Sequence, residues 1–140
     1  MKIQDIMTKE VIRANHDMTL QRASEIFIEY GFHHIPVVDD DDHVIGIVSD
    51  RDVCKHVSPY LGTEHERALD RQTLELLISD VMTPEPITIT EESRLDTASI
   101  LLLEHNFSCL PVIDIEHDTL MGIVTWKDLL NYYVYSEATG

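Results

Sequence analysis

Two segments of the chain carry hydrophobic residues at the spacing of an amphipathic helix, which predicts one helix in each segment. The apolar positions are Leu20, Ala23, Ile26, Phe27 and Tyr30 in the first segment, and Leu95, Ala98, Leu101 and Leu102 in the second. Thr19 and Ser93 stand where an N-cap is expected. Gly31 and Asn106 stand where a left-handed residue would end each helix.

Short apolar runs surround each predicted helix and indicate strands. One run precedes the helix, and two follow it, joined by a polar turn. A closing helix is expected to begin at Ser49 in the first segment and at Thr125 in the second. The expected strands are Val11–Ile12, Ile35–Val38 and Val44–Val48 in the first segment, and Ile87–Ile89, Leu110–Ile113 and Leu120–Val124 in the second. Each segment therefore has the order β-α-β-β-α.

The two segments are copies of one unit. Asp5-Ile6-Met7-Thr8 returns as Asp80-Val81-Met82-Thr83, an offset of 80 − 5 = 75. Gly46 matches Gly122 at an offset of 122 − 46 = 76, so one residue is inserted in the acidic stretch between the copies' strands. A register of this length indicates an internal duplication.

The duplication sets the expected domain organisation. We expect a first domain at residues 1–60, a helical linker at residues 61–76 and a second domain at residues 77–140. Within and beyond the linker, Glu64–Ile78 is rich in helix formers, which favours a helical extension over a flexible tether. The predicted fold class is α+β (an α/β-type pair), with two packed β-α-β-β-α repeats.

The chain is strongly acidic, with 10 Lys and Arg against 26 Asp and Glu and a net charge of −16 when His is neutral. A field of this sign repels nucleic acid and anionic membranes, so neither is expected as a partner. The N-terminus lacks the apolar core of a signal peptide, and no apolar run is long enough to cross a bilayer. We expect a cytoplasmic protein in which Cys54 and Cys109 are reduced thiols rather than a disulfide.

Three motifs, each present twice, carry a resemblance to a known family. They are Asp-hydrophobe-Met-Thr, hydrophobe-Pro-Val and Gly-Ile-Val-Ser/Thr-x-x-Asp, in the same order and at matching spacing. This pattern resembles the CBS domains, named after cystathionine β-synthase, of which two form a Bateman module. The resemblance covers residues 1–57 and about 77–135.

The resemblance implies two domains related by pseudo-twofold symmetry, with clefts between them that hold adenosine-containing ligands in many relatives. The expected regulatory ligand is an adenine nucleotide (AMP, ADP or ATP) or S-adenosylmethionine. The resemblance also implies a homodimer, for which Tyr132, Tyr133 and Tyr135 supply an aromatic stretch, and an unidentified effector protein as a further partner. No catalytic constellation and no phosphate-binding glycine loop is found, so an enzyme is not expected.

The strongest binding candidates are the two copies of Ser/Thr-x-x-Asp. Ser49 and Thr125 each end a predicted strand and open a helix, where backbone N–H groups and the hydroxyl can donate to a phosphate. Asp52 and Asp128, three residues later, could accept from ribose hydroxyls. The same pattern is close to a capping box, which would need these residues only to start the helix. The resemblance favours ligand binding, and one residue can serve both roles.

Further site residues follow from position and from the resemblance. His33-His34 precedes Ile35-Pro36-Val37, a place that faces nucleotide phosphates in a similar module, whereas the second copy has the uncharged Ser108-Cys109. This difference predicts two unequal sites. The remaining candidates are Arg13, Arg51 and Lys127 as cations near phosphate, Thr88 as the equivalent of Arg13, and Ile12, Ile35, Pro36, Val37, Leu110 and Pro111 as apolar walls. Solvated surface positions for the cations, and plain core packing for the apolar residues, remain open.

Two other classes of function remain as alternatives. A metal- or redox-responsive module could use His33, His34, Asp39 and His43 as ligands. A structural dimerisation unit would bind no ligand. The run Asp39–Asp42 lacks the ligand spacing of an EF-hand, so we interpret it as a solvated turn.

Overall fold

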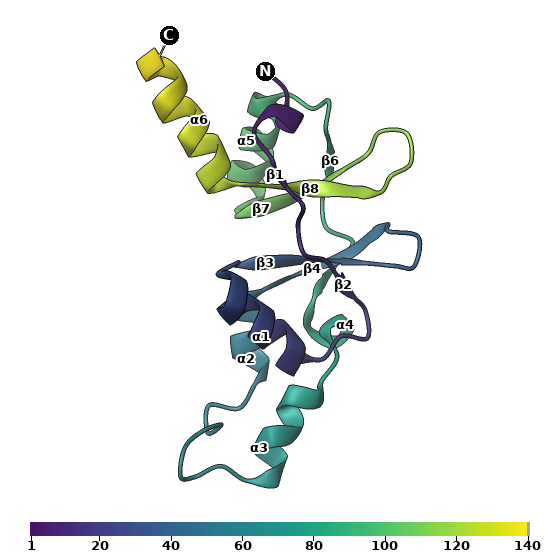
Figure 1. Cartoon of the computed structure of the whole chain (residues 1–140), viewed down its shortest axis with the longest axis vertical. Coiled ribbons are helices and arrows are strands. Elements are labelled where there is room, and N and C mark those ends of the chain that lie inside the picture. The colour runs from purple at the N-terminus through teal and green to yellow at the C-terminus, as the bar shows by residue number, and fades with distance from the viewer. Residues whose placement is uncertain (140) are drawn as a thin grey trace. The chain divides into compact units, whose positions relative to one another are not determined.

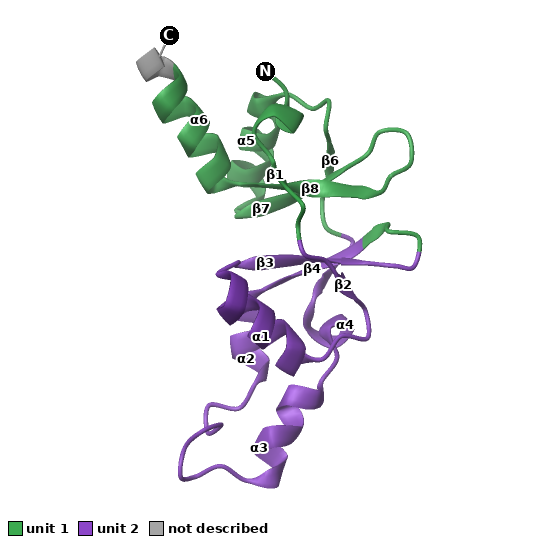
Figure 2. Ribbon diagram, in the orientation of Figure 1, with its two compact units in different colours: residues 1–11, 41–44, 86–140 green, residues 12–40, 45–85 purple. Residues whose placement is uncertain are grey.

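The structure is a computed structural model that describes residues 1–139 and the side chains of residues 1–136. The chain forms two compact units (Figure 2). Unit 1 contains residues 1–11, residues 41–44 and the described residues from 86 on, and unit 2 contains residues 12–40 and 45–85. None of the described helices is both long and apolar enough to cross a membrane.

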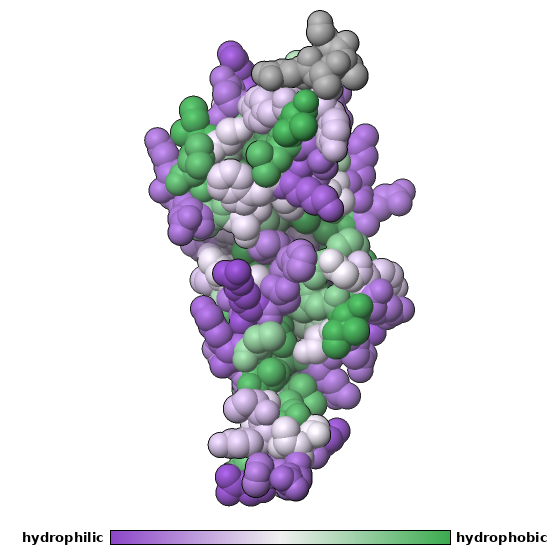
Figure 3. Space-filling model, turned by 90° about the vertical axis from the view of Figure 1, so that its left-hand side faces the viewer, coloured by the Kyte–Doolittle hydropathy of each residue, from purple (hydrophilic) through white to green (hydrophobic). Residues whose placement is uncertain are grey.

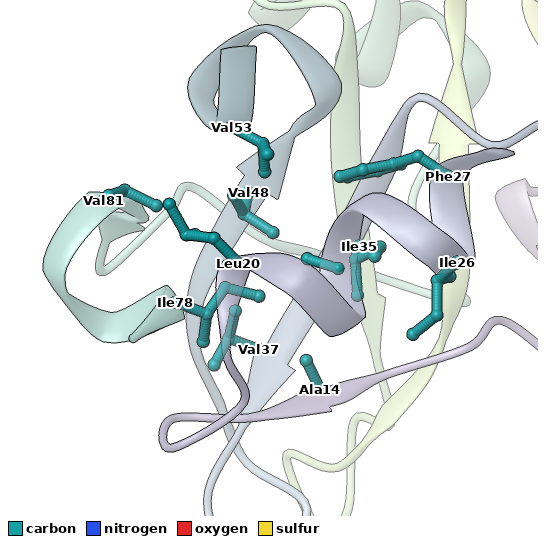
Figure 4. Packing of buried hydrophobic residues seen from close by; sticks show 11 residues of the cluster. Ala14, Leu20, Ile26, Phe27, Ile35, Val37, Val48, Val53, Ile78 and Val81 are labelled. Atoms are coloured by element: carbon teal, nitrogen blue, oxygen red, sulfur yellow. The ribbon is translucent and has the colours of Figure 1, made fainter. Parts of the chain in front are cut away.

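Unit 2 is a four-stranded sheet in the order β2-β3-β4-β5, with helices packed against it (Figure 1). The strands are β2 (Ala14–Asn15), β3 (His34–Val38), β4 (Val44–Ser49) and β5 (Thr83–Pro84). The helices are α1 (Leu20–Tyr30), α2 (Asp50–His56), α3 (Ala68–Gln72) and α4 (Ile78–Val81), with a 3-10 turn at Thr73–Glu75. Figure 4 shows the core, in which Leu20 of α1, Ile35 and Val37 of β3, and Ile78 of α4 point toward one another.

Unit 1 has the equivalent sheet, in the order β1-β8-β7-β6. Its elements are a 3-10 turn (Ile3–Asp5), β1 (Thr8–Lys9), β6 (Ile89–Thr90), α5 (Leu95–His105), β7 (Cys109–Ile113), β8 (Leu120–Thr125) and α6 (Trp126–Thr139). The core contains Ile3 from the N-terminal segment together with Leu102 of α5, Leu110 of β7 and Val124 of β8. The predicted α+β class with an internal repeat is therefore confirmed.

The compact units do not coincide with the sequence repeats, because each repeat sends one short strand into the sheet of the other. Strand β1 pairs antiparallel with β8, with Lys9 opposite Gly122. Strand β5 pairs antiparallel with β4, with Pro84 opposite Gly46. Both exchanged strands begin at the Thr of the repeated Asp-hydrophobe-Met-Thr motif and are only two residues long, so periodicity alone does not reveal them. The linear boundaries at residues 1–60, 61–76 and 77–140 remain a prediction about the repeats.

Most of the predicted helix ends are confirmed. The Thr19 hydroxyl accepts from the backbone N–H of Arg22, and Gly31 and Asn106 are left-handed, at φ 70° and 56°. The Ser93 prediction is wrong: its hydroxyl oxygen accepts from the backbone N–H of Thr90, and α5 begins after Arg94, which makes no side-chain cap bond.

Three other local predictions need correction. Tyr30 does not enter the core, because it is the last residue of α1, is half exposed, and stacks on Phe32 at 5.8 Å between ring centroids. The strands expected at Val11–Ile12 and Ile87–Ile89 lie slightly later, where Ala14 and Ile89 pair in parallel with Val37 and Val112. The helical extension expected over Glu64–Ile78 begins only at Ala68 and is broken again at Leu76-Leu77, whose backbone is extended.

Candidate ligand-binding site

The first repeat forms a reciprocal cap where β4 runs into α2. Ser49 ends the strand and its hydroxyl oxygen accepts from the backbone N–H of Asp52 at 3.1 Å. Asp52 Oδ2 in turn accepts from the backbone N–H of Ser49 at 2.9 Å. This reciprocal pair satisfies two backbone donors that the first turn of a helix leaves without partners. The capping interpretation of Ser49-x-x-Asp52 is therefore confirmed.

The second repeat builds the same cap with additional donors. Asp128 Oδ2 accepts from the backbone N–H of Thr125 at 2.9 Å and from the Thr125 hydroxyl at 3.1 Å. The Thr8 hydroxyl, from the exchanged strand β1, donates to both oxygens of Asp128 at 3.3 Å. The carboxylate of Asp128 is thus held in place by side chains from two segments of unit 1.

In both repeats the dipeptide at the start of β3 or β7 lies beside the cap. The backbone N–H of Asp50 donates to the carbonyl of His33 at 3.0 Å, and that of Trp126 donates to the carbonyl of Ser108 at 3.4 Å. We call Ser49–Asp52 with His33-His34 the first junction, and Thr125–Asp128 with Ser108-Cys109 the second junction. At each junction the structure brings together two groups of candidate residues from the sequence analysis, the Ser/Thr-x-x-Asp motif and the dipeptide.

The first junction carries several titratable groups. His33 Nδ1 lies 2.9 Å from Asp50 Oδ2, and this nitrogen donates to the carboxylate when it is protonated. Partial burial raises the pKa of Asp50, but the hydrogen bonds from His33 and from the backbone N–H of Arg51 outweigh this effect and hold the pKa below its ordinary 3.8. Burial lowers the pKa of His34, and the His33 charge adds to this effect, while Asp50 and Asp52 oppose it.

Asp50 is the junction residue that sequence reasoning missed. Its position inside Ser49-x-x-Asp52 is unspecified by the motif, so the pattern gives no reason to select it. The available signal was its charge beside two histidines that the strand order brings to the same end of the sheet. His33, which was also a candidate metal ligand, has Asp50 as its partner in this structure.

The second junction has uncharged groups at the matching positions. Cys109 is buried in β7, where burial foremost and the nearby Asp128 charge raise the pKa of its thiol to about 12. Its strand pairs it with Thr125 of β8. Trp126 takes the place of Asp50, and its indole N–H donates to the carbonyl of Phe107 at 2.9 Å. Two unequal junctions are therefore present.

Family comparison agrees with the duplicated fold and the duplicated junction. The model of the CBS domain family matches residues 3–59 and 78–135, which together cover most of the chain. The chain belongs to the CBS domain family. Both matched segments include a complete Ser/Thr-x-x-Asp cap.

Relatives of two kinds match this CBS chain. A CBS domain-containing protein of Dictyostelium discoideum is 33% identical over 94% of the chain and 90% of its own length. An L-aspartate semialdehyde sulfurtransferase of Methanocaldococcus jannaschii is 28% identical over 91% of the chain. The chain spans only 22% of the length of that enzyme.

Solved structures of CBS pairs are similar over nearly the whole chain. CBSX2 of Arabidopsis thaliana, solved in complex with AMP, is 28% identical with a TM-score of 0.80, covering 97% of this chain and 98% of its own. The CBS domain pair of protein MJ0100, in complex with 5′-methylthioadenosine and S-adenosyl-L-methionine, is 26% identical with a TM-score of 0.78 and the same coverage.

The remaining candidate residues of the CBS pair divide by burial. Ile35, Val37 and Leu110 have no exposed surface and belong to the cores, which is the alternative that the sequence left open for them. Pro36 and Pro111 are also fully buried. Ile12, Arg13 and Thr88 are half-buried, and Arg51 and Lys127 are exposed. The role of each in binding stays a prediction.

Proposed function

We propose that this chain is a regulatory, non-catalytic module that binds an adenosine-containing ligand at its two junctions. One observation carries the proposal: both repeats hold a hydroxyl and a carboxylate three residues apart where a strand meets a helix. AMP, 5′-methylthioadenosine and S-adenosylmethionine in the solved CBS pairs support the ligand class. Which of the adenine nucleotides or S-adenosylmethionine acts here is a matter for titration.

The geometry suggests a role for each group at the first junction. The cap bond uses Oδ2 of Asp52, so Oδ1 is the oxygen we assign to the ribose hydroxyls. The Ser49 hydroxyl can rotate and donate to a ligand oxygen while its oxygen still accepts from the helix. Capping and binding are therefore compatible, because the cap fixes the rotamers that the ligand needs.

Thermal-shift and calorimetric titration with AMP, ATP, S-adenosylmethionine, 5′-methylthioadenosine and adenosine tests the proposal. A ligand that binds only the folded chain stabilises it by about 2.7 kcal/mol at a hundredfold excess over its Kd. Guanosine and GMP serve as controls for the base. The proposal is wrong if no adenosine compound shifts the melting temperature more than its guanosine counterpart does.

We further infer that the module acts as a homodimer or through a protein partner. Helices α5 and α6 leave large apolar side chains exposed: Ile100, Leu103, Leu130, Tyr133, Val134 and Tyr135. Green, hydrophobic groups are visible between polar ones on the face shown in Figure 3. At two of the equivalent positions the first repeat has a different kind of residue, with Glu25 matching Ile100 and Cys54 matching Leu130, whereas Ile28 matches Leu103. A second copy of the chain is the occupant we favour, because an uncharged face avoids contact between like charges in a chain of net charge −16.

The same proposal places the module in the cytoplasm. Cys54 and Cys109 are free thiols in the structure, which fits a reducing compartment. Tyr132, one of the three tyrosines considered for the interface, instead packs partly against the core of unit 1.

A further inference from the structure

The two junctions share their backbone geometry but differ in charge at matching positions. The first junction has His33, His34 and Asp50 where the second has Ser108, Cys109 and Trp126. Arg51 and Lys127 are equivalent, as are Asp52 and Asp128. The two junctions therefore differ in the dipeptide at the start of the strand and in the first residue of the helix. Asp50 gives the first junction its additional negative charge.

Asp50 contacts His33 through both its side chain and its backbone. Its carboxylate lies 2.9 Å from the imidazole Nδ1, and its backbone N–H donates to the His33 carbonyl at 3.0 Å. The His33 side chain is 76% exposed and that of Asp50 is 40% exposed, so both can be reached from solvent. When Nδ1 carries its proton, the carboxylate thus occupies a donor that would otherwise be available to a phosphate group at this junction.

We propose that Asp50 determines the charge class of the ligand at the first junction. A phosphate would have to displace this carboxylate from His33 and remain beside its negative charge, whereas an uncharged or cationic 5′ substituent would not. With both imidazoles neutral, Arg51 against Asp50 and Asp52 gives 1 − 2 = −1. The first junction therefore selects adenosine ligands with a thioether or sulfonium group, and the second junction is the one that accepts a phosphate.

This inference rests on the proposed function and deepens it, because it assigns a ligand class to each junction. The solved relatives include complexes with a nucleotide and with thioether and sulfonium nucleosides, so both classes occur among CBS pairs of this fold. At the second junction Trp126 carries no charge, so the charges of Lys127 and Asp128 sum to 1 − 1 = 0. Its indole stays engaged with the Phe107 carbonyl and adds no charge.

Calorimetric titration with AMP and with 5′-methylthioadenosine tests the inference, because the two ligands share the nucleoside and differ at the 5′ position. An Asp128→Asn background removes the carboxylate of the second junction while an amide oxygen can still cap α6. In this background at pH 8, Asp50→Asn should raise the affinity for AMP relative to 5′-methylthioadenosine on the order of tenfold, since one nearby negative charge is removed. Asp40→Asn, at an exposed position of the same unit, changes the net charge equally and should leave the ratio unchanged.

The reciprocal substitution at the second junction provides a second test in case Asp50→Asn does not fold. In an Asp52→Asn background, Trp126→Asp should lower the affinity for AMP relative to 5′-methylthioadenosine, and Trp126→Asn should not. Equal ratios in Asp50→Asn and its parent, or the same rise in Asp40→Asn, overturn the role of Asp50 and leave the proposed function standing. If neither AMP nor 5′-methylthioadenosine binds any of the chains, wild type included, the inference falls, and the titrations with ATP, S-adenosylmethionine and adenosine decide whether the proposed function falls as well.

Discussion

The Thr8 hydroxyl donates to both carboxylate oxygens of Asp128 at 3.3 Å, although the two residues are 120 positions apart in the chain. This bond exists because β1 crosses into the sheet of the second repeat and pairs with β8. The exchanged strand therefore supports a candidate ligand-binding residue as well as closing the sheet. The orientation of Asp128 depends on the N-terminal segment as much as on the helix it caps.

Asp128→Ala is expected to destabilise the chain more than Asp52→Ala. Loss of a helix cap costs about 1 kcal/mol, and this cost applies to both variants. Asp128 additionally accepts from the hydroxyls of Thr125 and Thr8, so its removal should cost roughly 1 kcal/mol more. Urea denaturation measures both free energies of unfolding. Thr8→Val is the matched control, and in its background the difference between the two alanine variants should shrink; an unchanged difference would contradict this account.

Gly122→Ala should be more damaging than Gly46→Ala. A Cβ at Gly122 would collide with the backbone carbonyl of Thr8 in β1, which is held by its pairing to β8. A Cβ at Gly46 would collide with the side chain of Met82, which can change rotamer. Overpacking costs typically about 1–3 kcal/mol, and we expect the upper end for Gly122 and the lower end for Gly46. Denaturant midpoints measure the order, and Gly46→Ala with Met82→Ala should recover part of the loss.

The sequence predicted those features of the fold that depend on local pattern and on the duplication. Helices α1 and α5 and the four long strands follow from hydrophobic periodicity, and the caps at Thr19 and Gly31 follow from the backbone conformation that a helix end requires. The repeat also predicted that His33 and Ser108 lie at equivalent junctions. The exchanged strands β1 and β5 could not be predicted from the sequence, because a strand of two residues has no hydrophobic period and its pairing is decided by tertiary contacts.

The backbone cap of the candidate site could be predicted from the sequence, whereas its charged contacts could be predicted only in part. The Ser/Thr-x-x-Asp motif fixes the cap, but it leaves the two middle positions open, and Asp50 lies at one of them. Its importance comes from the contact with His33, which depends on the backbone bond that brings α2 against the start of β3. Similarly, the position of Ile35 and Val37 after His33-His34 made them candidates for apolar walls, with core packing as the alternative, and both side chains are fully buried in the core.

His33→Ala should raise the pKa of Asp50. Burial already raises it, and the His33 hydrogen bond is the largest of the effects that lower it. The folded-state pKa lies below that of the unfolded chain, so Asp50 contributes stability above its unfolded pKa and loses it as the pH falls through the folded value. Carboxyl carbon NMR of Asp50 between pH 2 and 6 measures the change. His16→Ala, at an exposed position of the same unit, is the control and should leave the Asp50 titration in place.

Charged substitutions on α5 and α6 should dissociate the proposed homodimer. Leu103 is 64% exposed and Leu130 is 54% exposed, and burying an introduced carboxylate against a second copy of an acidic chain is unfavourable. Leu103→Glu and Leu130→Glu should therefore give a monomer by light scattering at micromolar concentration. Ile28→Glu and Cys54→Glu, at the equivalent positions of the first repeat, add the same charge and should retain the dimer. A wild-type chain that is already monomeric would refute the prediction.

The pH dependence of stability should contain a contribution from His34. Burial is the main cause of its lowered pKa, and the folded value lies below the 6.5 of the unfolded residue. As the pH falls below 6.5, the unfolded chain takes up a proton on this residue before the folded chain does, so the free energy of unfolding decreases. The loss grows until the pH reaches the folded pKa and is constant below it. His34→Gln, which cannot titrate, should remove this part of the slope.

In an Asp50→Asn chain, whose first junction we expect to accept a phosphate, the same proton makes phosphate binding depend on pH. A phosphate near His34 favours the imidazolium, and binding to a neutral ring must take up a proton from solution. ATP affinity should therefore increase as the pH falls from about 8 to 6. Calorimetry in buffers of different ionisation enthalpy counts the protons taken up, and adenosine, which has no phosphate, should show no such uptake. If Asp50→Asn and the same chain with His33→Ala and His34→Ala take up equal numbers of protons with ATP, neither histidine lies at the phosphate, and Arg13 and Arg51 are the cations to test next.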